Sequence, residues 1–273
     1  MLEKVAVVVP FHKSTLTVNE AFALSQIVKT LKSYPLLFAL PAGIDPAFVK
    51  ASGGQTIYFP AIHFQSILNY DRLFCSLEFY ETFNNYSHIL VAQLDSIVFS
   101  DQLAFWCQQP YDFIGAPWVF NLAREHPYAR DFMSPWHRSQ KFLRLRSIFG
   151  RDYQVGNGGF SLRKVQTFIR VLTDHREEVT RFRIWAEKLW QQGYKTATNE
   201  DFFWSILVPT FYKQFRVPTF KVAASFSFEC NPAYCFKRNH RQLPFACHAW
   251  EKHGPDFWLP FLKQLGYQVK GEK

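Results

Sequence analysis

Apolar residues are grouped along the first third of the chain in short runs that alternate with helical repeats. Continuous apolar, β-branched runs of this length are typical of strands covered on both faces. Such runs occupy residues 4–10, 34–40, 55–59 and 88–95. Apolar residues spaced three and four apart predict helices over residues 19–31 and 70–83. This β-α-β-β-α-β order predicts an α/β fold with a mostly parallel sheet flanked by helices.

The second half of the chain has a different pattern. Residues 121–151 show no strand pattern and carry seven basic residues against two acidic ones, so we interpret them as a basic excursion. The pattern further predicts helices over residues 165–189 and 255–267, a helix from Phe202 stopped by Pro209, and a strand over residues 222–228. No repeat or linker divides the chain, so we expect one domain over residues 1–273.

The composition favours a folded protein with an anionic partner. Hydrophobic residues make up 48% of the 273 residues and charged residues 19%, which argues against disorder. The net charge of +9 suits nucleotide diphosphates, acidic glycans or a membrane surface, and it would also suit nucleic acid. No apolar run is long enough to span a bilayer, and the five cysteines are an odd number. We therefore expect a reduced, cytoplasmic protein, with a peripheral position at the inner face of the membrane as a further possibility.

Four features in chain order carry candidate chemistry. Asp95 ends an apolar strand, where ligands bind in open α/β sheets, although Asp is also a common turn residue. Gly158 and Gly159 allow close backbone approach, or simply form a tight turn. Glu200 and Asp201 open a predicted helix, where one carboxylate could be a general base or both could complement the helix dipole. His248 is either a ligand or a satisfied core residue.

The order of these features resembles the GT-A glycosyltransferases, which combine an Asp-x-Asp metal motif, a glycine loop, an x-Glu-Asp motif and a late histidine. The chain is more closely similar to an uncharacterised bacterial family of GT-A-like proteins. The shared phrases lie at residues 93–95, 111–118, 156–163, 200–201, 226–229 and 244–248, and the resemblance covers nearly the whole chain.

The resemblance implies a role for each matching residue. Asp95 and His248 would bind Mn²⁺ or Mg²⁺, and Gln93 stands where the metal motif has its first Asp, which is a departure. The residues that would lie around a nucleotide-sugar donor are Phe11, His12, Gln93, Asp95, Gly158 and Gly159. Either Arg163 or an arginine of the basic excursion would assist the leaving diphosphate. Asp201 would be the catalytic base, with Glu200 as support.

The function implied is a metal-assisted, inverting sugar transfer to a hydroxyl of a glycan or lipid-linked acceptor, in cell-surface polysaccharide biosynthesis. Three alternatives remain open at this point. The fold could have lost catalysis and only bind a nucleotide or glycan, because Gln93 leaves the metal motif with one carboxylate. Cys230, Cys235, Cys247 and His248 could form a Cys₃His zinc site. The basic excursion could bind single-stranded nucleic acid, although no nucleic-acid motif is present and we expect no such partner.

Overall fold

The structure, a computed structural model, describes residues 4–119, 154–193 and 199–268. Its centre is a six-stranded sheet with the order β3-β2-β1-β4-β9-β6. The strands are β1 (Val5–Pro10), β2 (Leu36–Pro41), β3 (Gln55–Phe59), β4 (His88–Ala92), β6 (Phe113–Ile114) and β9 (Phe160–Lys164). The first four run parallel, and β9 runs antiparallel to both β4 and β6. The predicted α/β fold with a mostly parallel sheet is confirmed.

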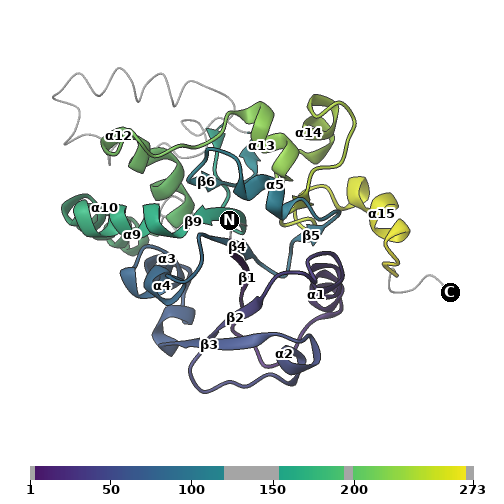
Figure 1. Ribbon diagram of the computed structural model, residues 1–273, viewed down its shortest axis with the longest axis horizontal. Helices are drawn as coiled ribbons and strands as arrows, with labels where there is room; N and C mark the ends of the chain where they lie inside the picture. The colour runs from purple at the N-terminus through teal and green to yellow at the C-terminus, as the bar shows by residue number, and fades with distance from the viewer. Residues whose placement is uncertain (1–3, 120–153, 194–198, 269–273) are drawn as a thin grey trace.

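Helices cover both faces of this sheet, as Figure 1 shows. The helices are α1 (Val18–Thr30), α2 (Ala47–Ala51), α3 (Ile67–Phe74), α4 (Leu77–Thr82), α5 (Leu103–Cys107), α9 (Val165–Asp174), α10 (Arg176–Gln191), α11 (Glu200–Phe202), α12 (Val208–Phe211), α13 (Phe220–Phe226), α14 (Pro232–Arg238) and α15 (Pro255–Gln264). A 3₁₀ turn, η1 (Ala61–Phe64), precedes α3, and a π-helical turn, η3 (Phe203–Leu207), joins α11 to α12.

Strand β1 explains why two layers of helices are needed. Its alternate side chains leave opposite faces of the sheet, and all of them are apolar and buried. Ala6 and Val8 pack in the cluster that includes α3, α4 and α9, whereas Val5, Val7 and Val9 pack with α1 and α2. A sheet buried on both faces requires continuous apolar strands, which is the pattern that the sequence shows.

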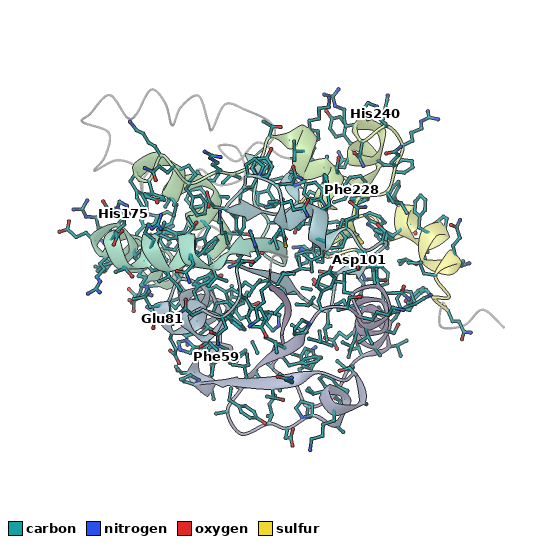
Figure 2. All side chains as sticks on the ribbon, in the orientation of Figure 1. Phe59, Glu81, Asp101, His175, Phe228 and His240 are labelled. Atoms are coloured by element: carbon teal, nitrogen blue, oxygen red, sulfur yellow. The ribbon has the colours of Figure 1, made fainter. Side chains whose placement is uncertain are left out.

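A smaller sheet lies beside the carboxyl end of β4. It has the order β10-β11-β5, formed by β10 (Ser227–Phe228), β11 (Ala246–Cys247) and β5 (Ile97–Val98). Its strands are short. Ile97, Phe228 and Cys247 pack with α15 in a third apolar cluster, and Phe228 is labelled in Figure 2. A further pair, β7 (Pro117–Trp118) and β8 (Gln154–Val155), flanks residues 120–153. The basic excursion at residues 121–151 lies outside the described residues.

Several predicted elements have different bounds or types. The helix predicted over residues 70–83 is two helices, because Ser76 accepts a backbone hydrogen bond and starts α4. The helix predicted over residues 165–189 is likewise divided at His175 between α9 and α10. Pro209 does not stop its helix, because the helical run continues from η3 into α12, with Pro209 in the first turn of α12. The strand predicted over residues 222–228 was wrong, since α13 occupies most of it and only β10 is extended.

Candidate functional site

A cavity of about 620 Å³ opens at the carboxyl ends of β1 and β4. The chain runs from β1 to β2 and β3 on one side and returns to β4 on the other, so the strand order reverses between β1 and β4. Ligands of open α/β sheets bind at this kind of switch point. Phe11 and His12 line the cavity after β1, Gln93 and Asp95 line it after β4, and Tyr70 of α3 lines it beside Gln93.

Three ligand atoms converge beside this cavity. The Nε2 atom of His248 lies 3.2 Å from Asp95 Oδ1 and 3.2 Å from Gln93 Oε1. Strand β4 ends at Ala92, so Gln93 and Asp95 stand in the turn after it rather than inside the strand predicted over residues 88–95. The turn nevertheless aims both side chains at the imidazole, which follows β11.

The residues at this point fit a divalent cation. Asp95 Oδ1 is buried and, among the described residues, has no partner beyond its ion-pair contact with His248. A carboxylate oxygen, an imidazole nitrogen and an amide oxygen are ligands that suit Mn²⁺ or Mg²⁺. The absence of a side chain at Gly159 leaves room for the imidazole, because a Cβ there would lie 2.0 Å from His248 Nε2. The glycine is therefore required for this close approach.

Acidic groups on both sides set the charge of His248. Its Nδ1 lies 3.3 Å from Oε1 of Glu229, opposite Asp95. Burial alone would lower the pKa of His248, but Asp95 and Glu229 outweigh it and raise the pKa to about 10. The same imidazolium holds the pKa of Asp95 below its usual value although burial opposes this. Positive charge is thus strongly favoured at this point, whether it is carried by a proton or by a metal ion.

Gln93 is oriented by a residue that the sequence did not point to. The Tyr70 hydroxyl accepts a 2.8 Å hydrogen bond from Gln93 Nε2, which leaves Oε1 directed at His248. Tyr70 was only the first residue of a predicted helix, and its contact with Gln93 joins residues far apart in sequence. Glu229 was also missed as a site residue, although it stands in one of the phrases shared with the family.

Asp201 lies beneath the glycine turn and outside the cavity lining. Its Oδ2 accepts a hydrogen bond from the Gly158 backbone N–H at 3.3 Å, and its Oδ1 accepts one from Phe202 N–H at 2.7 Å. The side chain is nearly buried, and the π-helical turn η3 begins two residues later. Burial, together with the carboxylates of Glu200 and Glu229, raises the pKa of Asp201 to about 8.

Arg163 and Glu200, which were predicted to assist the leaving diphosphate and to support the base, do not line the cavity. They form a two-point ion pair in the interior, with Nη1 to Oε2 at 3.0 Å and Nη2 to Oε1 at 2.6 Å. Arg163 is fully buried, and its remaining hydrogen bonds go to Ser161, Tyr80 and the Gly158 carbonyl. Among the described residues, Arg163 joins Glu200 to the Gly158 carbonyl, so this pair fixes the glycine turn and the start of α11.

Gly158 and Gly159 are also buried and do not line the cavity. A Cβ on Gly158 would lie 2.3 Å from Glu200 Oε1, so this position admits the buried ion pair as Gly159 admits His248. Of the predicted donor-binding residues, Phe11, His12, Gln93 and Asp95 line the cavity. The imidazole of His12 has a lowered pKa because of burial and the neighbouring Lys13, which favours its neutral form.

The alternative zinc site does not form. Among the described residues, the Cys, His, Asp and Glu ligand atoms that gather within 4.8 Å of one another belong to Glu229, Cys230 and His253. Cys235 and Cys247 are buried elsewhere in the apolar cluster around β10 and β11. Cys230, Cys235, Cys247 and His248 therefore do not make a Cys₃His centre. The basic residues considered for nucleic-acid binding lie outside the described residues.

Comparison with known proteins identifies the family of this chain. The sequence profile of a family described as "Protein of unknown function (DUF5672)" matches residues 54–248. The chain belongs to this family. The match spans the cavity wall from η1 onward, the glycine turn, Asp201 and His248, and it agrees with the resemblance inferred from the sequence. No curated protein matches the chain.

Solved glycosyltransferase structures superpose on this DUF5672 member at low sequence identity. The apo structure of the bifunctional glycosyltransferase WbbM superposes with a TM-score of 0.50 at 12% identity, over 93% of this chain and 47% of WbbM. The galactosyltransferase LgtC, bound to donor and acceptor sugar analogues, gives 0.48 at 14% identity, over 97% and 98% of the two chains. Core-mannan synthase A of Aspergillus fumigatus, in a Mn/GDP form, gives 0.48 at 12%, over 75% and 69%. At these identities the likeness to WbbM establishes the fold alone, which is the GT-A-like α/β fold.

Within the described ranges, no helix has the length and apolar character needed to cross a bilayer.

Proposed function

We propose that this chain is a glycosyltransferase that moves a sugar from a nucleotide-sugar donor to an acceptor hydroxyl, with inversion and with a divalent cation. The observation that supports it most is the convergence of Asp95 Oδ1, Gln93 Oε1 and His248 Nε2 at the edge of the cavity, at the switch point of a GT-A-like sheet. Mn²⁺ or Mg²⁺ held there would offset negative charge on the diphosphate of the donor.

The donor would occupy the cavity between β1 and β4. Phe11 is fixed by an edge-on contact with Phe48 at 5.4 Å between centroids, so it offers a rigid apolar wall to a nucleotide base. His12 follows it and supplies a polar group at the same wall. The diphosphate would then lie toward Asp95, where its oxygens complete the coordination that Gln93 and Asp95 leave open.

Asp201 would act as the base from the other side of the glycine turn. In an inverting transfer, the acceptor oxygen bonds to the anomeric carbon, the bond from that carbon to the diphosphate oxygen breaks, and the hydroxyl proton passes to Asp201. A carboxylate with a pKa of about 8 is matched to this task near neutral pH, because it is basic enough to take the proton. Because Asp201 lies outside the cavity lining, the acceptor would approach separately from the donor.

The acceptor would be a glycan or a lipid-linked glycan of cell-surface polysaccharide biosynthesis. The net charge of +9 supports an anionic acceptor, or a peripheral position at the inner face of the membrane. A second candidate function is ligand binding without catalysis. It is favoured by Gln93, which leaves Asp95 as the one carboxylate beside His248 Nε2 among the described residues and so weakens metal binding without the donor.

Calorimetric titration of Asp95→Ala tests the donor site. We expect wild type to bind nucleoside diphosphates more tightly with Mn²⁺ than without it, and Asp95→Ala to lose this enhancement while keeping its circular dichroism spectrum. Asp45→Ala, an exposed carboxylate away from the cavity, is the matched control. Equal Mn²⁺ enhancement in wild type and Asp95→Ala would disprove the metal site. Binding with no sugar transfer to any acceptor would favour the second candidate.

A further inference from the structure

A second group of ligand-type side chains lies on the other side of His248. Strands β10 and β11 pair in parallel, with Phe228 opposite Cys247, so the residues that follow them leave the small sheet at the same edge. Glu229 and Cys230 follow β10, and the turn that ends at His253 follows β11. One ligand atom from each of Glu229, Cys230 and His253 lies within 4.8 Å of the other two.

Only one of the two carboxylate oxygens of Glu229 has a partner among the described residues. Its Oε1 lies 3.3 Å from His248 Nδ1, whereas Oε2 is buried and has no hydrogen-bonding partner among the described residues. The side chain is 10% exposed. A buried carboxylate oxygen without a partner is costly, and a cation beside Oε2 would remove that cost.

The backbone around the other two side chains is held in place. The Cys230 carbonyl accepts a hydrogen bond from the Cys235 thiol at 3.6 Å. The His253 carbonyl accepts one from Trp258 Nε1 at 3.2 Å, and its N–H donates to the Ala249 carbonyl at 2.9 Å. Both side chains are partly exposed, so an ion could reach them from solvent.

We propose that Glu229, Cys230 and His253 form a binding site for a soft divalent transition-metal ion of the Zn²⁺ class, separate from the Asp95–His248 site. A thiolate selects Zn²⁺ over Mn²⁺ or Mg²⁺, and imidazole and carboxylate complete a typical zinc donor set. Tetrahedral ligand atoms bound at about 2.0–2.3 Å lie within about 4 Å of one another. Side-chain shifts on the order of 1 Å would therefore bring the three atoms, now within 4.8 Å of one another, to the spacing of ion ligands, with the fourth position open to water.

This site has a different ligand set from the Cys₃His centre excluded above. It uses Cys230 but neither Cys235 nor Cys247, and Glu229 and His253 replace them. It is also distinct from the proposed donor metal site, which uses the opposite nitrogen of His248. Glu229 lies between the two, so it would bind one ion through Oε2 and orient the ligand of the other through Oε1.

Cobalt substitution of the full chain tests the proposal. The protein is stripped with a chelator under reducing conditions and titrated with Co²⁺, which reports a thiolate ligand through a sulfur-to-cobalt charge-transfer absorption. We expect this absorption to saturate at one Co²⁺ per chain and to be displaced by Zn²⁺. We expect Cys230→Ser to abolish it, and His253→Asn to weaken Zn²⁺ binding by more than the roughly 10- to 100-fold that loss of an outer partner costs.

Matched variants separate this site from the donor site. Cys107→Ala, which removes the thiol at the end of α5 in the second apolar cluster, should keep the absorption. Asp95→Ala should also keep it, so failure of the proposed function would leave this result intact. No charge-transfer absorption in wild type, or an equal one in Cys230→Ser, would overturn the proposal. If Cys230→Ser does not fold, unchanged Zn²⁺ affinity in folded His253→Asn would overturn it instead.

Discussion

At the scale of single residues, Gly159 determines whether His248 can occupy its place. A methyl group there would lie 2.0 Å from Nε2 and 2.5 Å from Cε1, so the imidazole must move. We expect Gly159→Ala to reduce Mn²⁺-dependent binding of nucleoside diphosphates at least about tenfold, since a displaced ligand costs at least as much as a lost outer partner. Titration calorimetry in the presence and absence of Mn²⁺ measures this.

A suitable control for Gly159→Ala is Gly193→Ala. Gly193 has φ +88°, so alanine there is strained, but its Cβ would meet no atom of the described residues within 4 Å. The control should lower the melting temperature and leave Mn²⁺-dependent binding unchanged. Normal Mn²⁺ enhancement in Gly159→Ala would show that the imidazole does not bind the metal.

A second prediction at the residue scale concerns Asp201, the proposed catalytic base. Asp201→Asn keeps the size of the side chain but cannot accept a proton, so we expect kcat to fall by roughly 10²–10⁴-fold with donor affinity nearly unchanged. In wild type the base must be ionised. Because burial raises its pKa to about 8, kcat should be low below that pH, rise through it and level off above it.

The measurement for Asp201 is a pH profile of kcat for wild type and Asp201→Asn, with the exposed Asp174→Asn as control. A near-normal kcat in folded Asp201→Asn would remove Asp201 from the mechanism. A product that retains the anomeric configuration of the donor would contradict inversion while leaving the donor site untouched.

At the scale of elements, Arg163 of β9 links this strand to α4 through Tyr80 and to α11 through Glu200. Burial alone would lower the pKa of Arg163, but the Glu200 carboxylate more than offsets it, so the guanidinium stays charged. Arg163→Met would leave Glu200 buried without its cation. Loss of one partner of a buried ion pair costs about 3–5 kcal/mol, and we expect that decrease in the free energy of unfolding.

Denaturant unfolding measures the effect of Arg163→Met. The control is Arg181→Met, which breaks the exposed pair between Arg181 and Glu177 in α10. An exposed pair of this kind contributes at most about 1 kcal/mol. Equal destabilisation by the two substitutions would mean that Arg163 does not hold the glycine turn and α11 together.

The elements also show what the sequence could predict. Strands β1 to β4 and helix α1 were found because each is specified by its own apolar pattern, with the capping box of Thr17 and Glu20 adding a local start to α1. The strand β9 was missed because it depends on pairing with β4, from Ala92 opposite Phe160 to His88 opposite Lys164. The error at α13 has another cause, since a short apolar run suits a helix and a strand equally well.

Part of the candidate site could also be predicted from the sequence. Asp95, Glu200–Asp201 and His248 were recognised by order and by family resemblance, and the structure brings Asp95 and His248 together. The sequence could not show that the Glu200 carboxylate is paired with the buried Arg163 guanidinium. Burial and pairing across 37 residues are properties of the fold. For the same reason it gave no signal for Tyr70 or for the role of Glu229.

At the scale of the whole molecule, the two faces of one sheet carry most of the core. Strand β1 contributes side chains to both of the larger apolar clusters, and β11 joins the third cluster to the second through Ala246 and Cys247. Layers that share their strands cannot lose their packing independently. We therefore propose that the chain is one domain and unfolds as one cooperative unit, in which binding at the switch point stabilises every layer.

Scanning calorimetry of the full chain tests this last prediction. We expect one transition in which the calorimetric and van't Hoff enthalpies agree. A nucleotide sugar at about 100 times its Kd, with Mn²⁺, should add about 2.7 kcal/mol of stability. At roughly 2–4 °C per kcal/mol for chains of this size, the whole transition should move upward by about 5–10 °C.

Two transitions, of which the donor moves only one, would contradict the single domain. A single transition that no nucleotide sugar moves would contradict the donor site and leave the single domain intact, because cooperativity rests on the shared strands and the shift rests on the cavity.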